Sequence, residues 1–546
     1  MVLLTAATAL AQATGGVTQA TPRVEGAVRD ARTGQPIAGA RVTLYPGPNY
    51  RYGQPGLMTT ESRPDGGFTM TVPAPGPYIV NAVAEGYLPE GAAPRPIAVT
   101  TSATLTLLMV RQSSLEGRIV DADRGDPIAG VRMIPNVLRY QRGQLIPGIR
   151  PGLGTATTDS DGVFRFEGMV PGSYVFRLEI AAEQPKIHIG VNLEDIPSPD
   201  VGYGNQWWPG GASPTSEGAV QVVEGARIRL PDIRIARRRL LRLSGSVRPD
   251  QCNAGDKYRL SIFRFFGTAL GGGNASFAEA PPASVPCETP FVVDRLSPAE
   301  YRFAAAAEDA PPADARVVNE SVPVFNDVER DFYPMRNVTV TGMIELPEAF
   351  PPDARPRLAF RFSPIEGSSS SGPVQTPAER FQTNLPPNRS FYLTALGLPP
   401  PYYVSKVTYS GAPVVDAVLT VQPYSPDQTI KITISADGGS IEGTVSERGE
   451  PAPRAAVLAV PWPIRSIGGF PVHYFSTANE QGRYAVPSLP PGDYRVLAVP
   501  LSSWEMELQK PGLLSALASS GSEIALTPSG SVRLPLELKS LPVSRW

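Results

Sequence analysis

A short phrase with two aromatic residues recurs along this chain and constrains its fold more than any other feature. One aromatic residue opens an alternating apolar stretch, and a second follows a turn ten residues later. Three copies carry Pro-Gly before the second aromatic residue, which predicts a type II turn because Pro presets the first turn position and Gly accepts a positive φ at the next. The copies lie roughly 90 to 130 residues apart, which indicates domain-sized repeats. The five pairs are Phe68 and Tyr78, Phe164 and Tyr174, Phe291 and Tyr301, Tyr392 and Tyr402, and Tyr484 and Tyr494.

A second phrase, an alternating stretch centred on a glycine, precedes each aromatic phrase. Period-two alternation predicts a strand with one buried face, and the central glycine predicts a bulge or a close backbone approach. In the first two copies the stretch continues into Pro-Ile-Ala-Gly, at residues 36–39 and 127–130, which predicts a turn and a second strand. The central glycines are Gly26, Gly117, Gly245, Gly342 and Gly443.

Together these phrases resemble the carboxypeptidase regulatory-like domain family. The shared pattern is V-x-G-x-V, then G-x-P-I-x-G, then D-G-x-F and P-G-x-Y, and it is clearest in the first, second and fifth copies. The family consists of small transthyretin-like β-sandwiches, grouped with carbohydrate-binding-like folds. The resemblance therefore implies an all-β chain of about five tandem Greek-key, immunoglobulin-like sandwiches, similar to secreted bacterial proteins that string such domains together.

The phrases divide the chain into a signal-like segment and five domains with almost no linker between them. The 61 prolines and 52 glycines lie mostly at turns between apolar stretches, as expected for many short strands. One stretch, residues 502–517, has helical character, although Pro511 interrupts it. We expect closely coupled sandwiches in a rod or an arc. The predicted ranges are 1–20 for the signal-like segment, 21–111, 112–242 with an aromatic insertion, 243–336 with a cysteine pair, 337–437 and 438–546.

Two features predict export. The apolar N-terminal stretch ends in Ala9-Leu-Ala11 and resembles a secretory signal, although a buried first strand is the alternative. Cys252 and Cys287 are predicted to form a disulfide, which an oxidising compartment would preserve, with two buried thiols as the alternative. No other stretch is long and apolar enough to predict a transmembrane span. The predicted location is secreted, periplasmic or at the cell surface.

The sequence predicts no catalytic residue, metal site or cofactor. A zinc peptidase needs His-x-x-Glu, but Val191 follows His188 and Ser476 follows His473 at the position of the glutamate. The resemblance thus implies the regulatory fold and not the peptidase. The acidic turn at residues 159–162 lacks the oxygen ligands of a calcium loop and is better explained as a hairpin turn. With 49 basic and 51 acidic residues, the chain also lacks the charge excess of a nucleic-acid-binding protein.

Binding is the open part of the prediction. Tyr203, Trp207 and Trp208 lie in a Gly/Pro-rich insertion and could stack on a sugar ring; the alternative is that Trp207 and Trp208 plug a domain junction. We therefore expect a non-catalytic, exported, multi-domain binding or scaffold protein of the cell envelope. Carbohydrate is the leading ligand class by resemblance, followed by envelope proteins. The alternatives are a stalk or adhesin-like spacer, and an accessory module of an envelope hydrolase or outer-membrane transporter.

Overall fold

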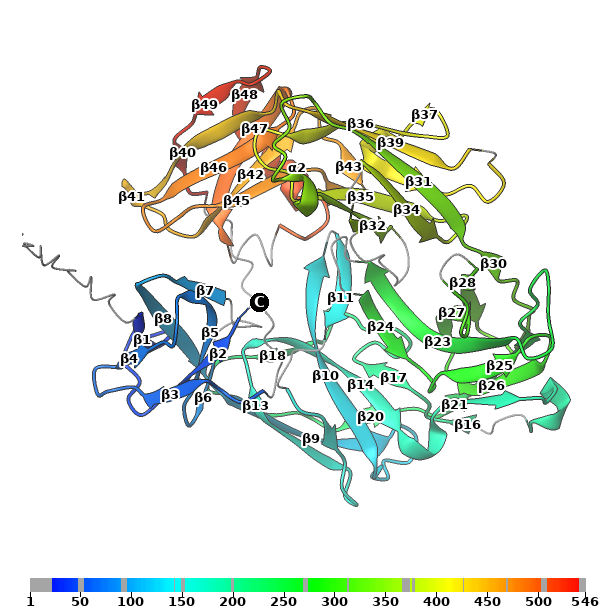
Figure 1. The fold of residues 1–546 in the computed structure, drawn as a ribbon. Coiled ribbons are helices and arrows are strands. Elements are labelled where there is room, and N and C mark those ends of the chain that lie inside the picture. Colours follow the sequence, from blue (N-terminus) through cyan, green and yellow to red (C-terminus); the bar gives the residue numbers. More distant parts are fainter. Residues whose placement is uncertain are drawn as a thin grey trace, which may run out of the picture.

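The computed structural model is nearly all β, with successive two-sheet sandwiches along the chain (Figure 1). The predicted fold class is confirmed. The signal-like segment lies outside the described residues. Among those residues, no helix is long and apolar enough to cross a membrane. The structure describes residues 22–47, 54–89, 96–141, 143–148, 153–197, 201–268, 274–311, 314–365, 374–375, 379–425, 427–467, 470–501 and 508–539.

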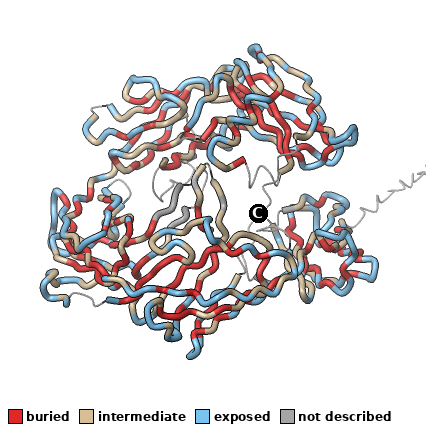
Figure 2. The backbone as a smooth tube through the Cα atoms, turned by 180° about the vertical axis from the view of Figure 1, so that it is seen from behind, coloured by how far each residue is buried: buried red, intermediate tan, exposed pale blue. Residues whose placement is uncertain are grey.

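All five sandwiches share one plan. The strand that carries the central glycine pairs antiparallel with the strand that carries the first aromatic residue, and parallel with the closing strand. A second sheet packs over this one and contributes the other half of the core. Apolar side chains of both sheets fill a separate core in each sandwich. In Figure 2 the buried residues accordingly follow the strands, while the connecting loops are exposed.

The first sandwich has two four-stranded sheets. One has the order β4-β1-β8-β6 and the other β3-β2-β5-β7. The strands are β1 (Arg23–Asp30), β2 (Arg41–Pro46), β3 (Met58–Glu61), β4 (Gly67–Thr71), β5 (Gly76–Val83), β6 (Tyr87–Pro89), β7 (Pro96–Val99) and β8 (Ser102–Arg111).

The second sandwich pairs the sheet β13-β9-β19, extended by β20, with the sheet β11-β10-β14-β17, extended by β12 and β18. The short strands β16 and β21 pair beside it. The elements are β9 (Ser113–Asp121), β10 (Val131–Gln141), β11 (Gln144–Gly148), β12 (Ala156–Thr157), β13 (Val163–Met169), β14 (Gly172–Ile180), η1 (Ala181–Glu183), η2 (Leu193–Asp195), β16 (Val201–Gly202), β17 (Gln206–Trp208), β18 (Val220–Val222), β19 (Arg227–Arg229), β20 (Ile233–Ile235) and β21 (Arg238–Arg239).

The third sandwich includes a strand from the part of the sequence predicted as the second domain. That strand, β15, lies at the edge of the sheet β15-β26-β22-β29. The opposite sheet is β24-β23-β27-β28-β30, with β25 paired to β23. The strands are β15 (Lys186–Ile189), β22 (Leu241–Ser246), β23 (Lys257–Thr268), β24 (Asn274–Ala278), β25 (Ala283–Pro286), β26 (Pro290–Leu296), β27 (Ala299–Ala307), β28 (Arg316–Val324), β29 (Val328–Glu329) and β30 (Met335–Arg336).

The fourth sandwich has the sheets β34-β31-β39-β36-β37 and β33-β32-β35-β38. Its elements are β31 (Val338–Glu345), η3 (Arg355–Arg357), β32 (Ala359–Pro364), β33 (Val374–Gln375), β34 (Arg380–Leu385), β35 (Ser390–Leu396), β36 (Tyr403–Tyr409), β37 (Ala412–Pro413), η4 (Val415–Ala417), β38 (Val418–Thr420) and β39 (Thr429–Ser435).

The fifth sandwich has the sheet β41-β40-β46, closed by β49 and β50, and the sheet β45-β42-β47-β48. The short strands β43 and β44 pair with each other. The elements are β40 (Gly439–Glu447), β41 (Glu450–Pro451), β42 (Ala455–Pro461), β43 (Ser466–Ile467), β44 (Phe470–Pro471), β45 (Tyr474–Thr477), β46 (Arg483–Leu489), β47 (Gly492–Pro500), α2 (Leu513–Ala518), β48 (Ser522–Leu526), β49 (Ser531–Arg533) and β50 (Leu536–Glu537).

A short helix covers the outer face of the fifth sandwich. Helical character was expected over residues 502–517; the structure has α2 at Leu513–Ala518, and residues 502–507 lie outside the described part. Leu514 on α2, together with Leu508 before it, packs on apolar side chains of β42 and β47. Every residue of β42 is therefore buried, because this strand has a core on both of its faces.

The central glycines are explained by close neighbours, which are aromatic rings at Gly117 and Gly342 and backbone carbonyl oxygens of the neighbouring parallel strand segment at Gly26, Gly245 and Gly443. In all five sandwiches the glycine pairs directly with the first aromatic residue of the phrase. A Cβ atom on Gly117 would lie 2.7 Å from Cζ of Phe164, and one on Gly342 would lie 2.0 Å from Cε1 of Phe381. The expected close approach is confirmed, because only a glycine leaves room for the ring or the carbonyl oxygen beside it.

This pairing corrects the alignment of the fourth copy. Gly342 pairs with Phe381 and not with Tyr392. Ten residues further on, Phe391 pairs with Pro364, as Tyr78 pairs with Pro46 in the first sandwich. The fourth phrase is therefore Phe381 and Phe391, and the spacing of ten residues holds. Sequence reasoning missed this because Tyr392 and Tyr402, which follow Phe391 and Pro401, are also ten residues apart.

The second aromatic residue is a tyrosine in the other four copies for a reason that spacing does not reveal. In each copy its hydroxyl group donates a hydrogen bond to the carbonyl oxygen four residues earlier, on the other side of the turn. This resembles the tyrosine corner of immunoglobulin-type sandwiches. The bonds run from Tyr78 to Ala74 (2.7 Å), from Tyr174 to Val170 (2.9 Å), from Tyr301 to Ser297 (2.6 Å) and from Tyr494 to Pro490 (2.7 Å).

The turn type predicted for the Pro-Gly copies is wrong. Gly172 and Gly492 have φ values of 159° and 151°, far from the roughly 80° of a type II turn. Each glycine is the first residue of the following strand, at β14 and β47. The tyrosine hydroxyl, rather than a type II geometry, connects the two sides of these turns.

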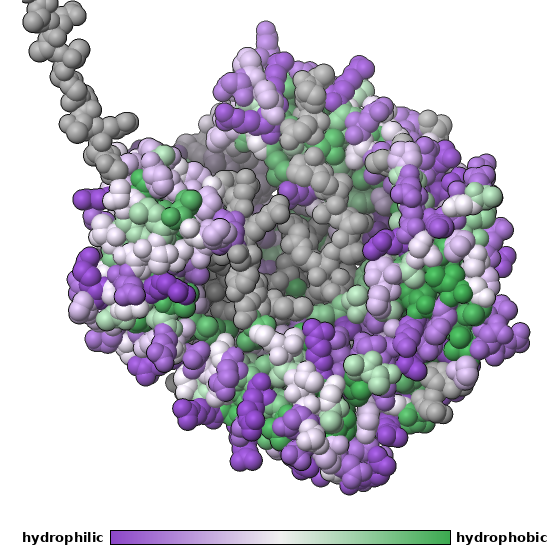
Figure 3. Space-filling model, turned by 60° about the horizontal axis from the view of Figure 1, so that its bottom comes forward, coloured by the Kyte–Doolittle hydropathy of each residue, from purple (hydrophilic) through white to green (hydrophobic). Residues whose placement is uncertain are grey.

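The sandwiches follow one another along a curved path. The first (blue) and the fifth (orange to red) consequently lie on the same side of the arc in Figure 1. The face turned forward in Figure 3 is mostly hydrophilic, with smaller hydrophobic areas between, because the apolar cores lie inside the individual sandwiches.

Candidate functional site at the junction of the second and third sandwiches

The insertion predicted to carry a sugar-binding platform lies at the junction of two sandwiches. Only 6% of Tyr203 and 2% of Trp207 is exposed. The indole of Trp207 packs edge-on against Phe277 of β24, with ring centroids 5.1 Å apart, whereas Trp208 lies against Phe176 in the core of the second sandwich. The three rings therefore do not form an exposed aromatic platform. The rings are packed against different neighbours and do not form the predicted stacking surface. Trp207 lies at the junction of two domains, which was the alternative to that prediction.

Tyr203 belongs to a polar contact with Asp121 and Arg237. Its hydroxyl group donates a 2.6 Å hydrogen bond to Oδ2 of Asp121, and the guanidinium group of Arg237 lies 5.2 Å from the ring centroid. The other carboxylate oxygen accepts hydrogen bonds from the backbone N–H groups of Asp123 and Arg124. The hydrogen bond from Tyr203 is the main reason that the pKa of Asp121 falls to about 2.

The first sandwich contains the same arrangement. Asp30 accepts hydrogen bonds from the hydroxyl group of Tyr87 (3.3 Å) and from Nε of Arg111 (3.4 Å). Backbone N–H groups of Arg32 and Thr33 donate to its other oxygen, and that of Thr33 is the largest cause of a pKa lowered to about 2. Both arginines lie where the chain leaves a sandwich. We call this arrangement the Asp–Tyr–Arg pin; it fixes the exit of the chain from the first two sandwiches.

The segment between Tyr174 and Tyr203 also supplies β15, the strand that the second part of the chain contributes to the third sandwich. Tyr87 follows Tyr78 by nine residues, whereas Tyr203 follows Tyr174 by 29. The additional length contains β15, which pairs with β26 of the third sandwich from Lys186 to Ile189. The length difference was the signal in the sequence, although it did not show where the additional strand would pair.

The two histidines occupy structural positions. His188 lies on β15, with Nε2 3.3 Å from Oδ2 of Asp294 on the neighbouring β26. Nδ1 of His473 lies 2.9 Å from the carbonyl oxygen of Pro471, and its ring packs edge-on against Phe470. In the acidic turn, Asp159 accepts hydrogen bonds from the N–H groups of Asp161 and Val163. The turn connects β12 and β13, which belong to different sheets, so it is a tight turn but not the hairpin turn that was expected.

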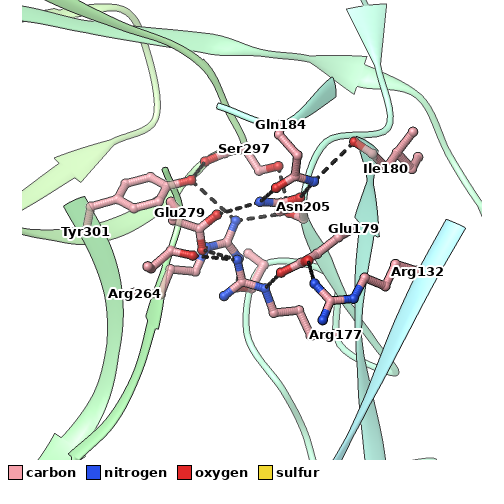
Figure 4. A network of polar contacts seen from close by, with 12 residues as sticks. Arg132, Arg177, Glu179, Ile180, Gln184, Asn205, Arg264, Glu279, Ser297 and Tyr301 are labelled. Atoms are coloured by element: carbon pink, nitrogen blue, oxygen red, sulfur yellow. Dashed lines mark hydrogen bonds and ion pairs between the residues drawn. The ribbon is translucent and has the colours of Figure 1, made fainter. Parts of the chain in front are cut away.

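A buried network of charged groups joins the two sandwiches (Figure 4). Oε1 of Glu279 lies 3.0 Å from Nε of Arg264 and 3.4 Å from Nη2 of Arg177. Arg177 is on β14 of the second sandwich, whereas Arg264 is on β23 of the third. Each of these three side chains is at most 3% exposed. Glu179 adds a second ion pair, 2.9 Å from Nε of Arg177.

Hydrogen bonds to the insertion complete this network. Arg264 donates to the carbonyl oxygens of Ala212 (2.7 Å) and Asn205 (3.0 Å), and Ser297 also donates to that of Asn205 (2.7 Å). The amide group of Asn205 donates to Oε2 of Glu279 (2.9 Å). These bonds tie the insertion of the second sandwich to Arg264, Glu279 and Ser297 of the third.

The buried charges hold the junction in one arrangement. The hydroxyl group of Tyr301, the corner tyrosine of the third sandwich, lies 3.3 Å from Nη2 of Arg264, and burial raises its pKa to about 12. Breaking a buried ion pair by removing one partner typically costs about 3–5 kcal/mol, because a charge is left uncompensated. We infer that the junction resists bending, since separating the two sandwiches would break the pair of Arg177 with Glu279 and the hydrogen bonds from Arg264 to Asn205 and Ala212.

Sequence reasoning missed this network. The core alternation of Tyr174, Phe176 and Leu178 places Arg177 on the opposite face of β14, where a charged residue normally faces solvent. Arg177 is buried only because β24 packs over that face, and no local sequence pattern predicts such packing.

The predicted cysteine pair is joined in the structure. Cys252 and Cys287 form a disulfide with Cα atoms 6.0 Å apart, within the usual range. The bond connects two loops of the third sandwich, where the N–H group of Cys287 donates to the carbonyl oxygen of Asp256.

Comparison with known proteins gives a family for the first sandwich. No curated protein matches the chain. Among solved structures, a minor pilin of Streptococcus agalactiae is 15% identical over 40% of this chain and 96% of its own, with a TM-score of 0.21. The shaft pilin SpaA of Lactobacillus rhamnosus GG is 13% identical over 39% and 95%, with a TM-score of 0.16. The Bacillus anthracis TIE protein is 13% identical, with a TM-score of 0.16; the match covers 58% of this chain and only 51% of the TIE protein.

These TM-scores are too low to support a functional argument. The family model of the carboxypeptidase regulatory-like domain, by contrast, matches residues 23–110 and spans β1 to β8. The first sandwich of this chain is therefore a carboxypeptidase regulatory-like domain, the family that the repeated phrases resemble.

Proposed function

We propose that the chain is a non-catalytic scaffold of the cell envelope that holds β-sandwich domains at fixed angles and binds protein partners. The observation that carries this proposal is the junction of the second and third sandwiches. Domains within one chain move relative to each other by default unless their interface is extensive. Here a shared strand, the buried ion pair of Arg177 with Glu279 and the hydrogen bonds from Arg264 to the insertion oppose such motion.

The proposed domains are those of the sequence, with one amendment. We assign residues 21–111, 112–242, 243–336, 337–437 and 438–546 to the five sandwiches, with β15 contributing to the third. The Asp–Tyr–Arg pins at Asp30 and Asp121 support short, fixed connections at the ends of the first two. Such connections suit a spacer or adhesin-like protein, in which neighbouring domains must keep fixed positions relative to each other.

The proposal includes export and a non-enzymatic role. The disulfide between Cys252 and Cys287 supports an oxidising compartment, and the regulatory-like family supports a binding role for the first sandwich. Carbohydrate, the ligand class implied by resemblance, loses its best candidate site, because Tyr203 and Trp207 are buried. A protein partner is therefore the class that we propose.

Fractionation of cells that express the full chain tests the location. Intact cells are treated with a protease that cannot enter them, and the remaining thiols are labelled under denaturing conditions without reductant. We expect the chain in the envelope fraction or the medium, digested by the external protease, with Cys252 and Cys287 unlabelled. A protease-resistant chain in the cytosol with two labelled thiols would overturn the proposal.

A further inference from the structure

The hairpin formed by β10 and β11 extends beyond its own sandwich. β10 pairs with β14 only from Val131 to Val137, while its remaining residues pair with β11 alone, as far as Gln141 opposite Gln144. The four residues after Val137 therefore extend about 13 Å beyond the sheet, at about 3.3 Å per residue. In Figure 1 this hairpin points from the second sandwich toward the opposite side of the arc.

The hairpin ends on the fifth sandwich. The backbone N–H group of Gly143 donates a 2.8 Å hydrogen bond to the carbonyl oxygen of Gln509. Gly143 has a φ of 82°, and its Cβ position lies 4.0 Å from Cα of Pro511, so its backbone is close to that of the fifth sandwich. The contact joins two sandwiches that are not neighbours in the sequence.

Both ends of this contact are anchored. Residue Ile146 of β11 is 3% exposed, and the hairpin lies beside β23 and β24 of the third sandwich. On the other side, Leu508 is fully buried in the outer core of the fifth sandwich, together with Leu514 of α2. The contact between Gly143 and Gln509 therefore connects two well-packed parts of the molecule.

The junction between the third and fourth sandwiches is held differently from the others. Among the described residues, its contacts include an exposed 3.6 Å hydrogen bond from Asn388 to the thioether of Met335 and a backbone hydrogen bond from Asn337 to Ala315. The fourth and fifth sandwiches, by contrast, share an ion pair between Asp416 and Arg465. Gly438, the first residue of the fifth sandwich, is also so close to the fourth that a Cβ atom on it would lie 2.0 Å from the carbonyl oxygen of Pro401, so these two sandwiches form one arm.

We propose that the β10–β11 hairpin is a clasp that holds this arm closed against the second sandwich. The junction at Met335 and Asn388 is the hinge about which the arm swings when the clasp opens. Opening would lengthen the molecule without unfolding a sandwich, because the rigid junction at Arg177 and Glu279 lies on the other side of the hinge.

The dimensions of the two forms differ enough to be measured. A domain of about 100 residues has a radius of gyration of about 13 Å, so five in a closed ring give about 30 Å, and five in a straight row, the upper limit for an open form, give about 50 Å. Small-angle X-ray scattering of the full chain should give about 30 Å. A wild-type value well above this would overturn the proposal.

A pair of proline variants tests the clasp itself. In Gly143→Pro the substitution removes the N–H donor and forbids the positive φ. The matched control is Gly449→Pro at the tip of the β40–β41 hairpin, where φ is 87° and a Cβ atom would meet no atom within 4 Å. Spin labels on cysteines that replace the exposed Ser160 and Ser519 report the distance between the second and fifth sandwiches.

We expect one narrow distance distribution in the wild type and in Gly449→Pro, and a longer, broader one in Gly143→Pro. Circular dichroism checks that all variants fold. If Gly143→Pro does not fold, Gly143→Ala, which keeps the N–H group but strains φ, should give a mixture of both distances. An unchanged distribution in the folded Gly143 variant would overturn the proposal.

Discussion

Removing the charge of Glu279 is the most informative perturbation of the junction. In Glu279→Gln the side chain keeps nearly the same volume, but the guanidinium groups of Arg177 and Arg264 lose the carboxylate that lies 3.4 and 3.0 Å away. Because both arginines are at most 3% exposed, water cannot replace that charge. We expect a loss of about 3–5 kcal/mol in the stability of the junction, as for other buried ion pairs that lose one partner.

A matched control separates this effect from a simple loss of negative charge. Glu320 pairs with Arg330 at the surface, where 36% and 45% of the two side chains are exposed. Glu320→Gln should therefore cost less than about 1 kcal/mol, as exposed ion pairs do. Replacing Glu279, Arg177 and Arg264 together with apolar residues should recover most of the loss, because these three buried charges are then removed and Glu179 keeps its ion pair with Arg132.

Hydrogen exchange read by mass spectrometry is the appropriate assay, because a chain of several domains does not unfold in one transition. Peptides that contain β14 and β15 should lose protection in Glu279→Gln, while peptides of the fifth sandwich should not change. Equal protection of β14 and β15 in both glutamine variants would refute the reasoning, since the buried pair would then contribute no more than an exposed one.

Three further predictions concern single sandwiches. Tyr174→Phe should destabilise the second sandwich by about 1 kcal/mol, the usual contribution of one hydrogen bond, measured as a shift in its denaturation midpoint. No shift would mean that the hydrogen bond to Val170 does not contribute to stability. Asp30 has a folded pKa of about 2 against an ordinary 3.8, so its contribution to the free energy of unfolding is present above pH 3.8 and is lost as the pH falls toward 2. The stability of Asp30→Asn, measured against pH, should lack this acid-dependent loss. A pH dependence of stability identical to that of the wild type would contradict the assignment. Reduction, or Cys252→Ser with Cys287→Ser, should cost the third sandwich about 3–4 kcal/mol in the chain-entropy model for a 35-residue separation, seen in thermal melts with and without reductant; superimposable melts would contradict it.

The sequence predicted the repeated strands well because their causes are local. Alternation around Gly26 or Gly117, and an aromatic residue ten positions before another, follow from which face of a strand is buried. The same reasoning explains the error in the fourth copy, where Tyr392 and Tyr402 imitate the spacing of Phe381 and Phe391. Only the pairing of Gly342 with Phe381 distinguishes the two alignments, and pairing is a long-range property.

The junction could not be predicted in the same way. Tyr203 and Trp207 were recognised as special residues, but aromatic residues in a Gly/Pro-rich loop are compatible with both a binding surface and a buried plug. The role of Trp207 depends on Phe277, which lies in another sandwich and 70 residues further along the chain. The deletion or insertion of a segment between repeats, here the one that contains β15, is the sequence signal that most directly points to a shared interface.

The angle between the second and third sandwiches tests the central claim most directly. Spin labels on cysteines that replace the exposed Ser160 and Asn326 place one probe in each of these sandwiches. The account predicts a single narrow distance distribution in the wild type that broadens in Glu279→Gln. A broad distribution in the wild type would show that the two sandwiches move freely, and it would contradict the account of a rigid scaffold.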